Sequence, residues 1–394
     1  MKVDKQTIMT EAASAVAKAV EYRRHIHKHP ELSFKEVETC AYVAGMLEEN
    51  GIEYRKIAGT GVLARIEGRG DLKSAVVLRA DMDALPVHEA TGYDFASSND
   101  GVMHACGHDM HTAALLAAMT VINRYRDCIE GTLFGLFQPG EEINPGGASL
   151  VLKEHPFDGY DVRAVIGEHV DPDLPTGTFG FREGKYMASS DEIRITVNGE
   201  GGHAALPHRL KDPVVAAAAI ITALQQVVSR NTNPDVPTVV SIGRVVADGS
   251  TNVIPDSVFM AGTLRTFDED WRAKSKERIC RIVESVADAY GVSAHVDISK
   301  GFPSVVNDPE LTSKVVSLTS GMFGSDSVVP LAIRPTAEDF GFYTQLYPAV
   351  FYRFGVGGRL GDRNVGRLHT SLFDPDEEAL EFAVTGLLNL AFNL

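Results

Sequence analysis

Apolar positions in the first half of the chain switch repeatedly between helical and extended spacing. Helical spacing predicts helices over residues 6–28 and 35–49, which end at His29-Pro30 and Asn50-Gly51. Short apolar runs bounded by glycine or charge predict strands over residues 62–66, 75–78, 132–137 and 164–166. Helical spacing predicts two further helices between the last three of these strands, over 111–126 and 147–154. Strands that alternate with helices predict an α/β sheet covered by helices on both faces.

The order of elements changes after residue 184. The pattern now predicts strand, helix, strand, strand, helix and strand, over 192–197, 211–230, 238–246, 257–265, 268–290 and 293–298. This β-α-β-β-α-β order is typical of the ferredoxin-like unit. We therefore expect an inserted domain at 185–298, within an α/β domain made of 1–184 and 299–394. The second part of the α/β domain should contain helices over 308–322, 338–346 and 376–392 and one strand over 350–354.

Length and charge narrow the class of protein. A chain of 394 residues favours two domains, and a formal net charge of −16 disfavours nucleic acid and anionic membranes as partners. Four scattered cysteines indicate a reducing compartment, and the charged N-terminal stretch does not resemble a signal peptide. The longest apolar run, Val214 to Leu224, is too short to span a bilayer. We expect a soluble, cytoplasmic protein.

Residues 103–111 contain an unusual number of side chains that can bind a metal ion. They contain Cys106 and three histidines, His104, His108 and His111. Cys106 and His108 stand two positions apart, so both can point the same way from an extended segment. A thiolate and an imidazole suit zinc, and imidazole also accepts manganese, cobalt or nickel. The alternative is a reduced cysteine among surface histidines.

Acids and histidines also follow the predicted strands. Asp81 and Asp83 end one strand, Glu141 and Glu142 follow the next, and His169 ends another. Open α/β sheets place their sites at the carboxyl ends of strands. Neighbouring residues in an extended segment point in opposite directions, so one glutamate could bind a metal while the other acts as general base. A solvated acidic pair is the alternative, but the apolar strand directly before it favours a site.

Six ordered motifs resemble one known family. RADMDALP, MHACGHDMHTA, QPGEE, GGHAALPH, NVIPD with GTLR, and LHTSLFDPDE resemble the aminoacylase, hippurate hydrolase and auxin-conjugate amidohydrolase family of two-metal, peptidase-like enzymes. The resemblance covers nearly the whole chain. It implies a zinc-peptidase-like α/β catalytic domain that is interrupted by a smaller lid domain, through which the chains commonly dimerise.

The resemblance also implies roles for individual residues. Glu141 matches the general base, and the metal ligands match Cys106, His108, Glu142, His169 and His369. Asp81 matches an acid that is catalytic in relatives, although Asp83 could hold that role instead. His203 matches a residue that reaches the scissile carbonyl, often across the dimer interface. The positions that hold the substrate match Asn252, Arg265 and, with a less defined role, His208.

Two positions depart from the family pattern. Glu168 stands where relatives often have an apolar residue, and it could add charge near the site or point away along the strand. Gly140 stands where relatives usually have alanine, which we expect to be a mild change. Neither departure removes a catalytic group.

These observations predict a metal-dependent hydrolase of N-acyl amino acids. It should use two divalent ions per subunit, zinc or manganese first and cobalt or nickel as alternatives, and should form a homodimer through the lid. A dipeptidase or aminopeptidase would use the same chemistry. A non-catalytic metal-binding homologue should show a damaged ligand or base, and the sequence shows neither. The preferred acyl group and amino acid stay open.

Overall fold

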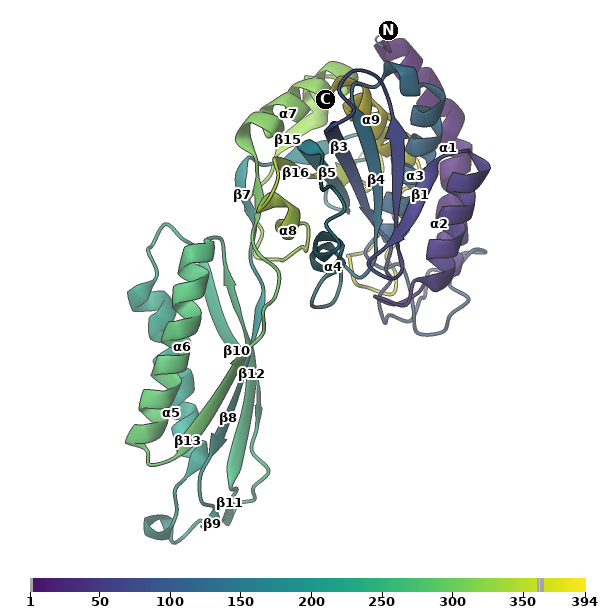
Figure 1. Cartoon of the computed structure of the whole chain (residues 1–394). Helices are drawn as coiled ribbons and strands as arrows, with labels where there is room; N and C mark the ends of the chain where they lie inside the picture. The colour runs from purple at the N-terminus through teal and green to yellow at the C-terminus, as the bar shows by residue number, and fades with distance from the viewer. Residues whose placement is uncertain (1–2, 360, 362–364) are drawn as a thin grey trace. The chain divides into compact units, whose positions relative to one another are not determined.

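The computed structural model describes residues 3–359, 361 and 365–394. Its contacts divide the chain into two compact units (Figure 1). Unit 1 contains residues 1–186, 306–333 and 339–394, and unit 2 contains 187–305 and 334–338. The boundaries expected from the sequence, 184/185 and 298/299, lie a few residues before those of the observed unit 2.

A mixed eight-stranded sheet forms the centre of unit 1. Its four middle strands, β4, β3, β5 and β16, are parallel and almost entirely buried, which explains their continuous apolar runs. The full order is β1 (Glu53–Ile57), β2 (Gly61–Glu67), β4 (Thr132–Gln138), β3 (Ser74–Asp81), β5 (Asp161–Asp171), β16 (Ala349–Gly355), β6 (Phe179–Phe181) and β15 (Val328–Pro330). The predicted α/β class is confirmed.

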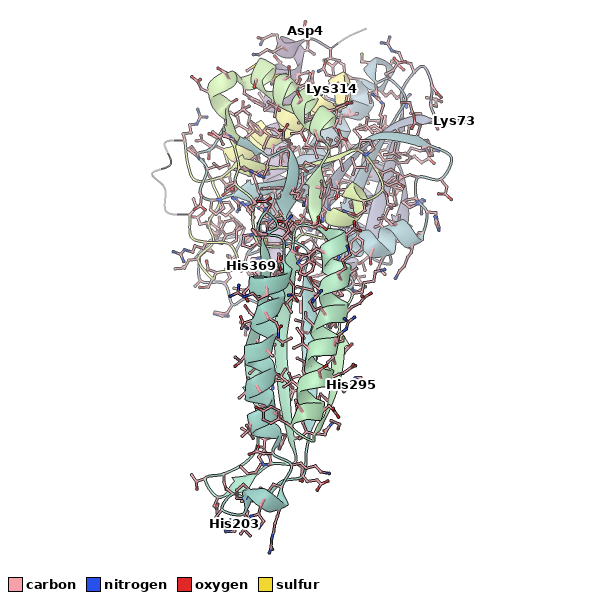
Figure 2. All side chains as sticks on the ribbon, turned by 90° about the vertical axis from the view of Figure 1, so that its left-hand side faces the viewer. Asp4, Lys73, His203, His295, Lys314 and His369 are labelled. Carbon is pink, nitrogen blue, oxygen red and sulfur yellow. The ribbon has the colours of Figure 1, made fainter. Side chains whose placement is uncertain are left out.

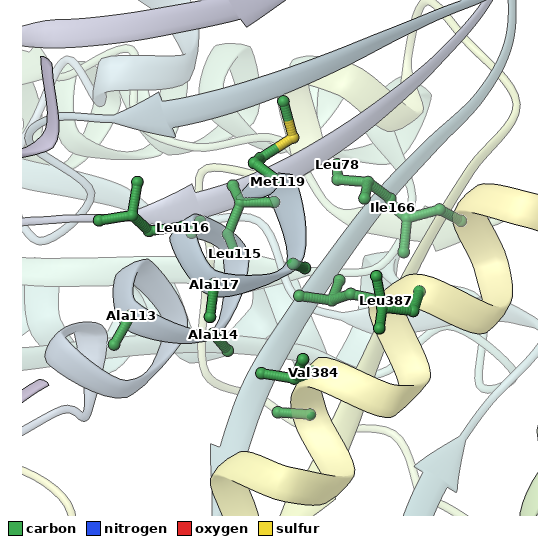
Figure 3. Close-up of a cluster of buried hydrophobic side chains, with 14 of the residues drawn as sticks. Leu78, Ala113, Ala114, Leu115, Leu116, Ala117, Met119, Ile166, Val384 and Leu387 are labelled. Carbon is green, nitrogen blue, oxygen red and sulfur yellow. The ribbon is translucent and has the colours of Figure 1, made fainter. Parts of the chain in front are cut away.

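Helix α3 (His108–Arg124) is the central helix of unit 1. It lies between the sheet and two further helices, α1 (Lys5–Lys28) and α9 (Ala379–Asn393). Its alanines and leucines are buried around most of its circumference, against Leu78 and Ile166 of the sheet and Val384 and Leu387 of α9 (Figure 3). The remaining helices of unit 1 are α2 (Val37–Glu49), α4 (Gly147–Lys153), α7 (Pro309–Phe323) and α8 (Gly341–Thr344).

Unit 2 has the predicted β-α-β-β-α-β order. Its antiparallel sheet runs β10 (Thr238–Val246), β12 (Ser257–Thr266), β8 (Asp191–Asn198) and β13 (Ser293–Ile298). Alternate residues of β8, Ile193, Ile195 and Val197, are buried with residues of α5 (Pro213–Gln226) and α6 (Glu269–Ala289). A short pair, β9 (Gly202–His203) with β11 (Val253–Ile254), lies beyond the long strands.

One helical stretch, Pro213–Asn231, is long and apolar enough to cross a membrane by length and composition alone. It comprises α5 and the π-helical turn η3 (Val227–Asn231). Ala216, Ala217, Ile220 and Leu224 of this stretch belong to the buried core of unit 2. Core packing therefore accounts for part of its apolar composition, since 33% of its most apolar window is buried.

Several elements differ from the sequence prediction. The helix predicted over 338–346 is wrong in extent, because only Gly341–Thr344 is helical. Single turns at η1 (Arg126–Cys128) and η4 (Ser325–Ser327), and the short strands β1, β6, β7 (Gly184–Met187), β14 (Val305–Asn307) and β15, were not predicted. Strands of three to five residues are too short for a period of two to stand out.

Candidate metal centre

The parallel order of β4, β3 and β5 brings distant residues to one edge of the sheet. β3 ends at Asp81 and β4 at Gln138, three residues before Glu141, while His169 lies near the end of β5. Neighbouring parallel strands have their carboxyl ends on the same side, so the segments that follow them converge there.

Five side chains with metal-ligand chemistry meet at this edge. Cys106 Sγ lies 3.4 Å from His169 Nε2 and 3.3 Å from His369 Nε2. Glu142 Oε1 lies 3.4 Å from His369 Nε2 and 3.8 Å from His108 Nε2. Two overlapping groups, Cys106-His108-His169 and Cys106-Glu142-His369, each keep their ligand atoms within 4.8 Å of one another. One thiol, three imidazoles and a carboxylate form this cluster.

Two atoms in the cluster are buried without a hydrogen-bond partner. They are His108 Nε2 and Glu142 Oε1. Unpartnered buried polar atoms are costly, and a cation held between them would remove that cost. The donor set of sulfur, nitrogen and oxygen fits a borderline-soft divalent ion. The residues therefore fit a metal centre.

Asp83 orients two members of the cluster. His108 donates its Nδ1 proton to Asp83, with Nδ1 2.9 Å from the carbonyl oxygen and 3.2 Å from Oδ1. Asp83 Oδ2 accepts from the Ser33 hydroxyl at 2.6 Å and from the Glu142 amide at 3.0 Å. Burial opposes ionisation, but these hydrogen bonds outweigh it and lower the pKa of Asp83. Asp83 thus directs His108 Nε2 into the cluster, as carboxylates commonly do for metal-binding histidines.

Asp81 makes a different set of contacts. Its Oδ1 accepts from His111 Nδ1 at 2.6 Å, and its Oδ2 accepts from Arg79 Nη1 at 2.6 Å. The other ring nitrogen of His111 accepts the Val170 amide at 2.9 Å. Both nitrogens of His111 are therefore engaged, so Asp81 and His111 serve as buried supports. Burial opposes ionisation of Asp81, but the nearby His108 and Arg79 hold its pKa well below the usual range.

Glu141 lies at the side of the cluster. It is 6% exposed, and one of its carboxylate oxygens lies within 4.8 Å of ligand atoms of His108 and Glu142. The preceding Gly140 has φ +60°, and a Cβ atom there would lie 2.2 Å from Cε1 of Phe34. With Phe34 in place, alanine does not fit at residue 140, so the glycine and this phenylalanine go together, and Glu141 keeps its position beside the cluster.

Gly107 places Cys106 and His108 against the sheet. It is the N-terminal cap of α3 with φ +83°, and a Cβ atom would lie 2.6 Å from Cγ2 of Val170. Only glycine accommodates both the left-handed backbone and this close approach. The helix consequently begins at His108, three residues earlier than predicted from the sequence.

His169 and Glu168 point to opposite faces of β5. His169 Nδ1 lies 2.8 Å from Arg353 Nη1 and 2.8 Å from the Val170 carbonyl oxygen. Burial and the charge of Arg353 hold the pKa of His169 well below its usual value. Glu168 instead accepts a 2.6 Å hydrogen bond from the Tyr352 hydroxyl, and burial raises the pKa of Glu168 to about 8. Of the two alternatives for Glu168, the structure selects the one in which it points away.

His369 is held mainly by its backbone. It adopts φ +62°, which is uncommon for a residue other than glycine, and its amide donates to the Ala105 carbonyl at 2.8 Å. Its side chain is about half exposed, unlike the fully buried His108. The hydrogen bond to Cys106 and the nearby Glu142 carboxylate raise the pKa of His369 to about 10. A metal ion must displace that proton, so binding releases it.

The four remaining candidates lie in unit 2. His203 pairs with Val253, and the Ala204 amide donates to the Asn252 carbonyl at 3.0 Å, so these two candidates are neighbours. His208 lies in the short turn η2 (Pro207–Arg209) of the same region. Figure 2 shows His203 at the tip of unit 2, beyond the ends of the long helices.

Arg265 lies at the other end of unit 2. It pairs with Val239 on β10, next to the end of β12 that pairs with Asp191. The opposite end of β12, Ser257, pairs with Asn198 near the tip. Eight steps along the strand separate Ser257 from Arg265, which corresponds to about 26 Å at roughly 3.3 Å per residue. The tip residues and Arg265 therefore do not meet within one unit 2.

The sequence did not identify several supporting residues. Arg79 is buried and contacts Asp81, Gln138 and Asp339, the last two at 3.0 and 2.8 Å. Arg353 is also buried beside His169. An arginine inside an otherwise apolar strand was the available signal in both cases, since arginine is rarely fully buried without a partner.

Comparisons with known proteins agree with this geometry. Residues 77–392 match the family described as Peptidase family M20/M25/M40. Two relatives come from Bacillus subtilis (strain 168). An N-acetyl-L-cysteine deacetylase is 41% identical over 337 residues, and the match covers 85% of this chain and 80% of that protein. An N-acetylcysteine deacetylase is 42% identical over 374 residues, and the match covers 94% of this chain and 95% of that protein. The crystal structure of the Bacillus subtilis YXEP protein, described as a dinuclear metal binding peptidase from the M20 family, is 38% identical with a TM-score of 0.82, and the match covers 96% of this chain and 98% of that one. The chain therefore belongs to peptidase family M20/M25/M40.

Proposed function

We propose that this protein is a metal-dependent amidohydrolase that cleaves N-acyl amino acids to a carboxylic acid and a free amino acid. The observation that carries the proposal is the position of Glu141, a buried carboxylate within 4.8 Å of the ligand atoms of His108 and Glu142, where it would act as proton acceptor. The names of the two Bacillus subtilis deacetylases support an N-acyl amino acid as the substrate class.

Five residues would hold two divalent ions: Cys106, His108, Glu142, His169 and His369. The mixed sulfur, nitrogen and oxygen donors favour zinc or manganese, with cobalt or nickel as alternatives. The dinuclear description of the related Bacillus subtilis structure supports a pair of ions.

The chemistry divides between the ions and Glu141. When bound, the ions supply Lewis acidity, which polarises the amide carbonyl and makes the attacking water more acidic. Glu141 would accept a proton from that water as the water oxygen forms its bond to the carbonyl carbon. Glu141 then gives this proton to the amine nitrogen as the carbon–nitrogen bond breaks. Asp83 keeps His108 and the Glu142 backbone in place throughout.

Unit 2 would act as a ferredoxin-like lid over this site. His203 would donate to the carbonyl oxygen as negative charge develops there, with Asn252 and His208 beside it. Arg265 would bind the substrate carboxylate through two parallel hydrogen bonds, which would select substrates that release an amino acid. We propose residues 185–298 as this lid, 1–184 with 299–394 as the catalytic domain, and the cytoplasm as the location, where the four free cysteines stay reduced.

We propose a homodimer because of the distance within unit 2. The tip carrying His203 and the strand end carrying Arg265 are farther apart than an N-acyl amino acid can reach. If both contact one substrate, two copies of the chain must contribute. The outer strand β10 presents exposed Val239 and Val245, and such an edge is suited to pairing with a second copy.

The substrate assay tests the proposal directly. Protein stripped with a chelator and reloaded with zinc or manganese should hydrolyse N-acetylcysteine, N-acetylmethionine or hippurate, and the stripped protein should not. Free-amine dipeptides with the same amino acids serve as the comparison. Faster cleavage of the dipeptides would instead establish a dipeptidase or aminopeptidase. Folded, metal-loaded protein that cleaves neither class would overturn the proposal.

Substitution of the base separates an enzyme from a metal-binding homologue. Glu141→Gln should keep the bound metal and lower kcat by about 10²–10⁴-fold, the usual contribution of a general base. Glu310→Gln, at an exposed position in unit 1, is the matched control and should keep full activity. Unchanged turnover in Glu141→Gln would contradict the assigned role.

A further inference from the structure

Two buried residues of α1 lie behind the metal cluster. Arg23 and His27 are one helical turn apart and 0% and 1% exposed, so they share the inward face of the helix. Both contact Oδ2 of Asp109, Arg23 Nε at 3.1 Å and His27 Nδ1 at 2.9 Å. Asp109 follows the ligand His108 in the first turn of α3. The end of α1 is thereby fixed to the segment that carries Cys106 and His108.

The same two residues also reach toward the segment that carries His369. His27 Nε2 lies 3.2 Å from Glu89 Oε1, and the next residue, Ala90, donates its amide to the Ser371 carbonyl at 2.8 Å. Arg23 Nη1 lies 2.8 Å from Glu377, which Arg24 also binds at 2.6 Å. The segment that contains His369 is therefore held at residue 371 and again at residue 377.

His369 depends on such support more than the other ligands do. Cys106, His108 and His169 are buried and fixed by surrounding side chains, whereas the His369 side chain is 52% exposed. Its positive φ is also a conformation that the surrounding structure must maintain. Displacement of its segment would remove one ligand from the Cys106-Glu142-His369 group and none from the Cys106-His108-His169 group.

We infer that Arg23 and His27 are positioning residues that set the affinity of one of the two metal positions, the one completed by His369. This inference rests on the metal-ligand roles in the proposed function. A purely structural role explains the arrangement less well, because burying an arginine, an imidazole and two carboxylates is costly, and apolar side chains of similar volume would pack there without that cost. The buried charges instead connect two ligand-bearing segments that are far apart in the sequence.

Metal titration of the stripped full-length protein tests the inference without substrate. Isothermal titration with Zn²⁺ should give two binding events for the natural chain. His27→Leu should weaken one of them by about 10–100-fold, the usual cost of losing support for a metal ligand, and leave the other unchanged. His369→Ala provides the reference for loss of that position. His88→Gln, an exposed histidine 78% accessible with a single acidic neighbour, is the matched control and should behave as the natural chain.

The outcomes are distinguishable. Two unchanged binding events in His27→Leu, or equal weakening of both, would overturn the inference while leaving the proposed function intact. A natural chain that binds no Zn²⁺ would overturn the proposed function itself. If His27→Leu does not fold, Glu377→Gln decides, because it alters only the partly exposed partner of Arg23 and Arg24. Selective weakening of one event in that variant supports the inference, and two unchanged events refute it.

Discussion

Asp83 contacts His108 Nδ1 through both its backbone carbonyl, at 2.9 Å, and its carboxylate, at 3.2 Å. The opposite ring nitrogen, Nε2, is consequently left without a hydrogen-bond partner and lies 3.8 Å from Glu142. One acid therefore fixes both the tautomer and the direction of the His108 ring. The sequence left open whether Asp81 or Asp83 orients the metal centre, and the contact with His108 favours Asp83.

Asp83→Asn should weaken metal binding without unfolding the protein. The amide keeps the size of the side chain but removes the charge that makes His108 a better ligand, so we expect affinity to fall by about 10–100-fold. Competition with a coloured chelator measures the dissociation constant. Asp100→Asn is the control, because Asp100 is 91% exposed and its carboxylate lies 2.9 Å from the exposed His88. An unchanged constant for Asp83→Asn would contradict this assignment.

The stability contributed by His27 should depend on pH in a defined direction. Burial lowers the pKa of His27, but hydrogen bonds to Asp109 and Glu89 outweigh it and raise the pKa to about 9. The folded-state value thus exceeds the unfolded value of about 6.5. The stabilisation is therefore complete below pH of about 6.5 and is lost as the pH rises through about 9.

Urea unfolding between these limits measures this dependence. The free energy of unfolding of the natural chain should exceed that of His27→Gln most at the acidic end, by about 3 kcal/mol at most. The difference should shrink as the pH rises toward the folded-state value. A difference that grows with pH would show that His27 is neutral in the folded protein.

Glu168→Gln should stabilise the protein at alkaline pH. Burial raises the pKa of Glu168 to about 8, so the folded chain retains a proton that the unfolded chain has lost above pH of about 4.5. Stability consequently falls as the pH rises from the lower to the upper of these values. Glutamine keeps an oxygen for the Tyr352 hydroxyl and carries no charge.

Thermal melts at several pH values test this expectation. The Tm of Glu168→Gln should exceed that of the natural chain at pH 8 and above by several degrees, and the gain should vanish on acidification toward the unfolded-state pKa. Tyr352→Phe, which removes the hydroxyl that donates to Glu168, should change Tm in the opposite direction. Equal Tm values for Glu168→Gln and the natural chain at all pH values would show that the ionised Glu168 carboxylate is stabilised by a neighbouring group.

Complementation tests the shared site. If His203 acts on the partner's substrate while Glu141 acts on its own, two inactive variants should restore activity when mixed. Random exchange of His203→Ala and Glu141→Gln subunits makes half the dimers mixed, each with one intact site, so about a quarter of the natural activity should return. No recovery, with mixed dimers demonstrated by tag pull-down, would mean that each chain uses its own His203.

Much of the architecture was accessible from the sequence. Continuous apolar runs identified the buried parallel strands, and the change of element order after residue 184 identified the β-α-β-β-α-β unit. The family resemblance is confirmed by the match over residues 77–392. The helix predicted over 338–346 was too long. Asp339 and Phe340 are both buried but lie before the helix, so their apolar and polar pattern reflects tertiary contacts and not helical spacing.

The supporting residues were less accessible, because their meaning depends on contacts between distant segments. His27 is one of three closely spaced histidines, and nothing in its local pattern separates it from the exposed His25, which stacks on Tyr42. Only the fold places His27 between Glu89 and Asp109. Likewise, the sequence left the direction of Glu168 open, and the structure decides it through the partner Tyr352, which lies on another strand.

The helix that begins at His108 is also the one most enclosed by the rest of unit 1. Its interior face and its outer face are both occupied, so a change of volume anywhere along it shifts the imidazole at its first residue. Attempts to redesign the substrate preference of this enzyme should therefore leave that helix untouched, together with the segments after the strand ends that carry Asp83, Glu141 and Glu142.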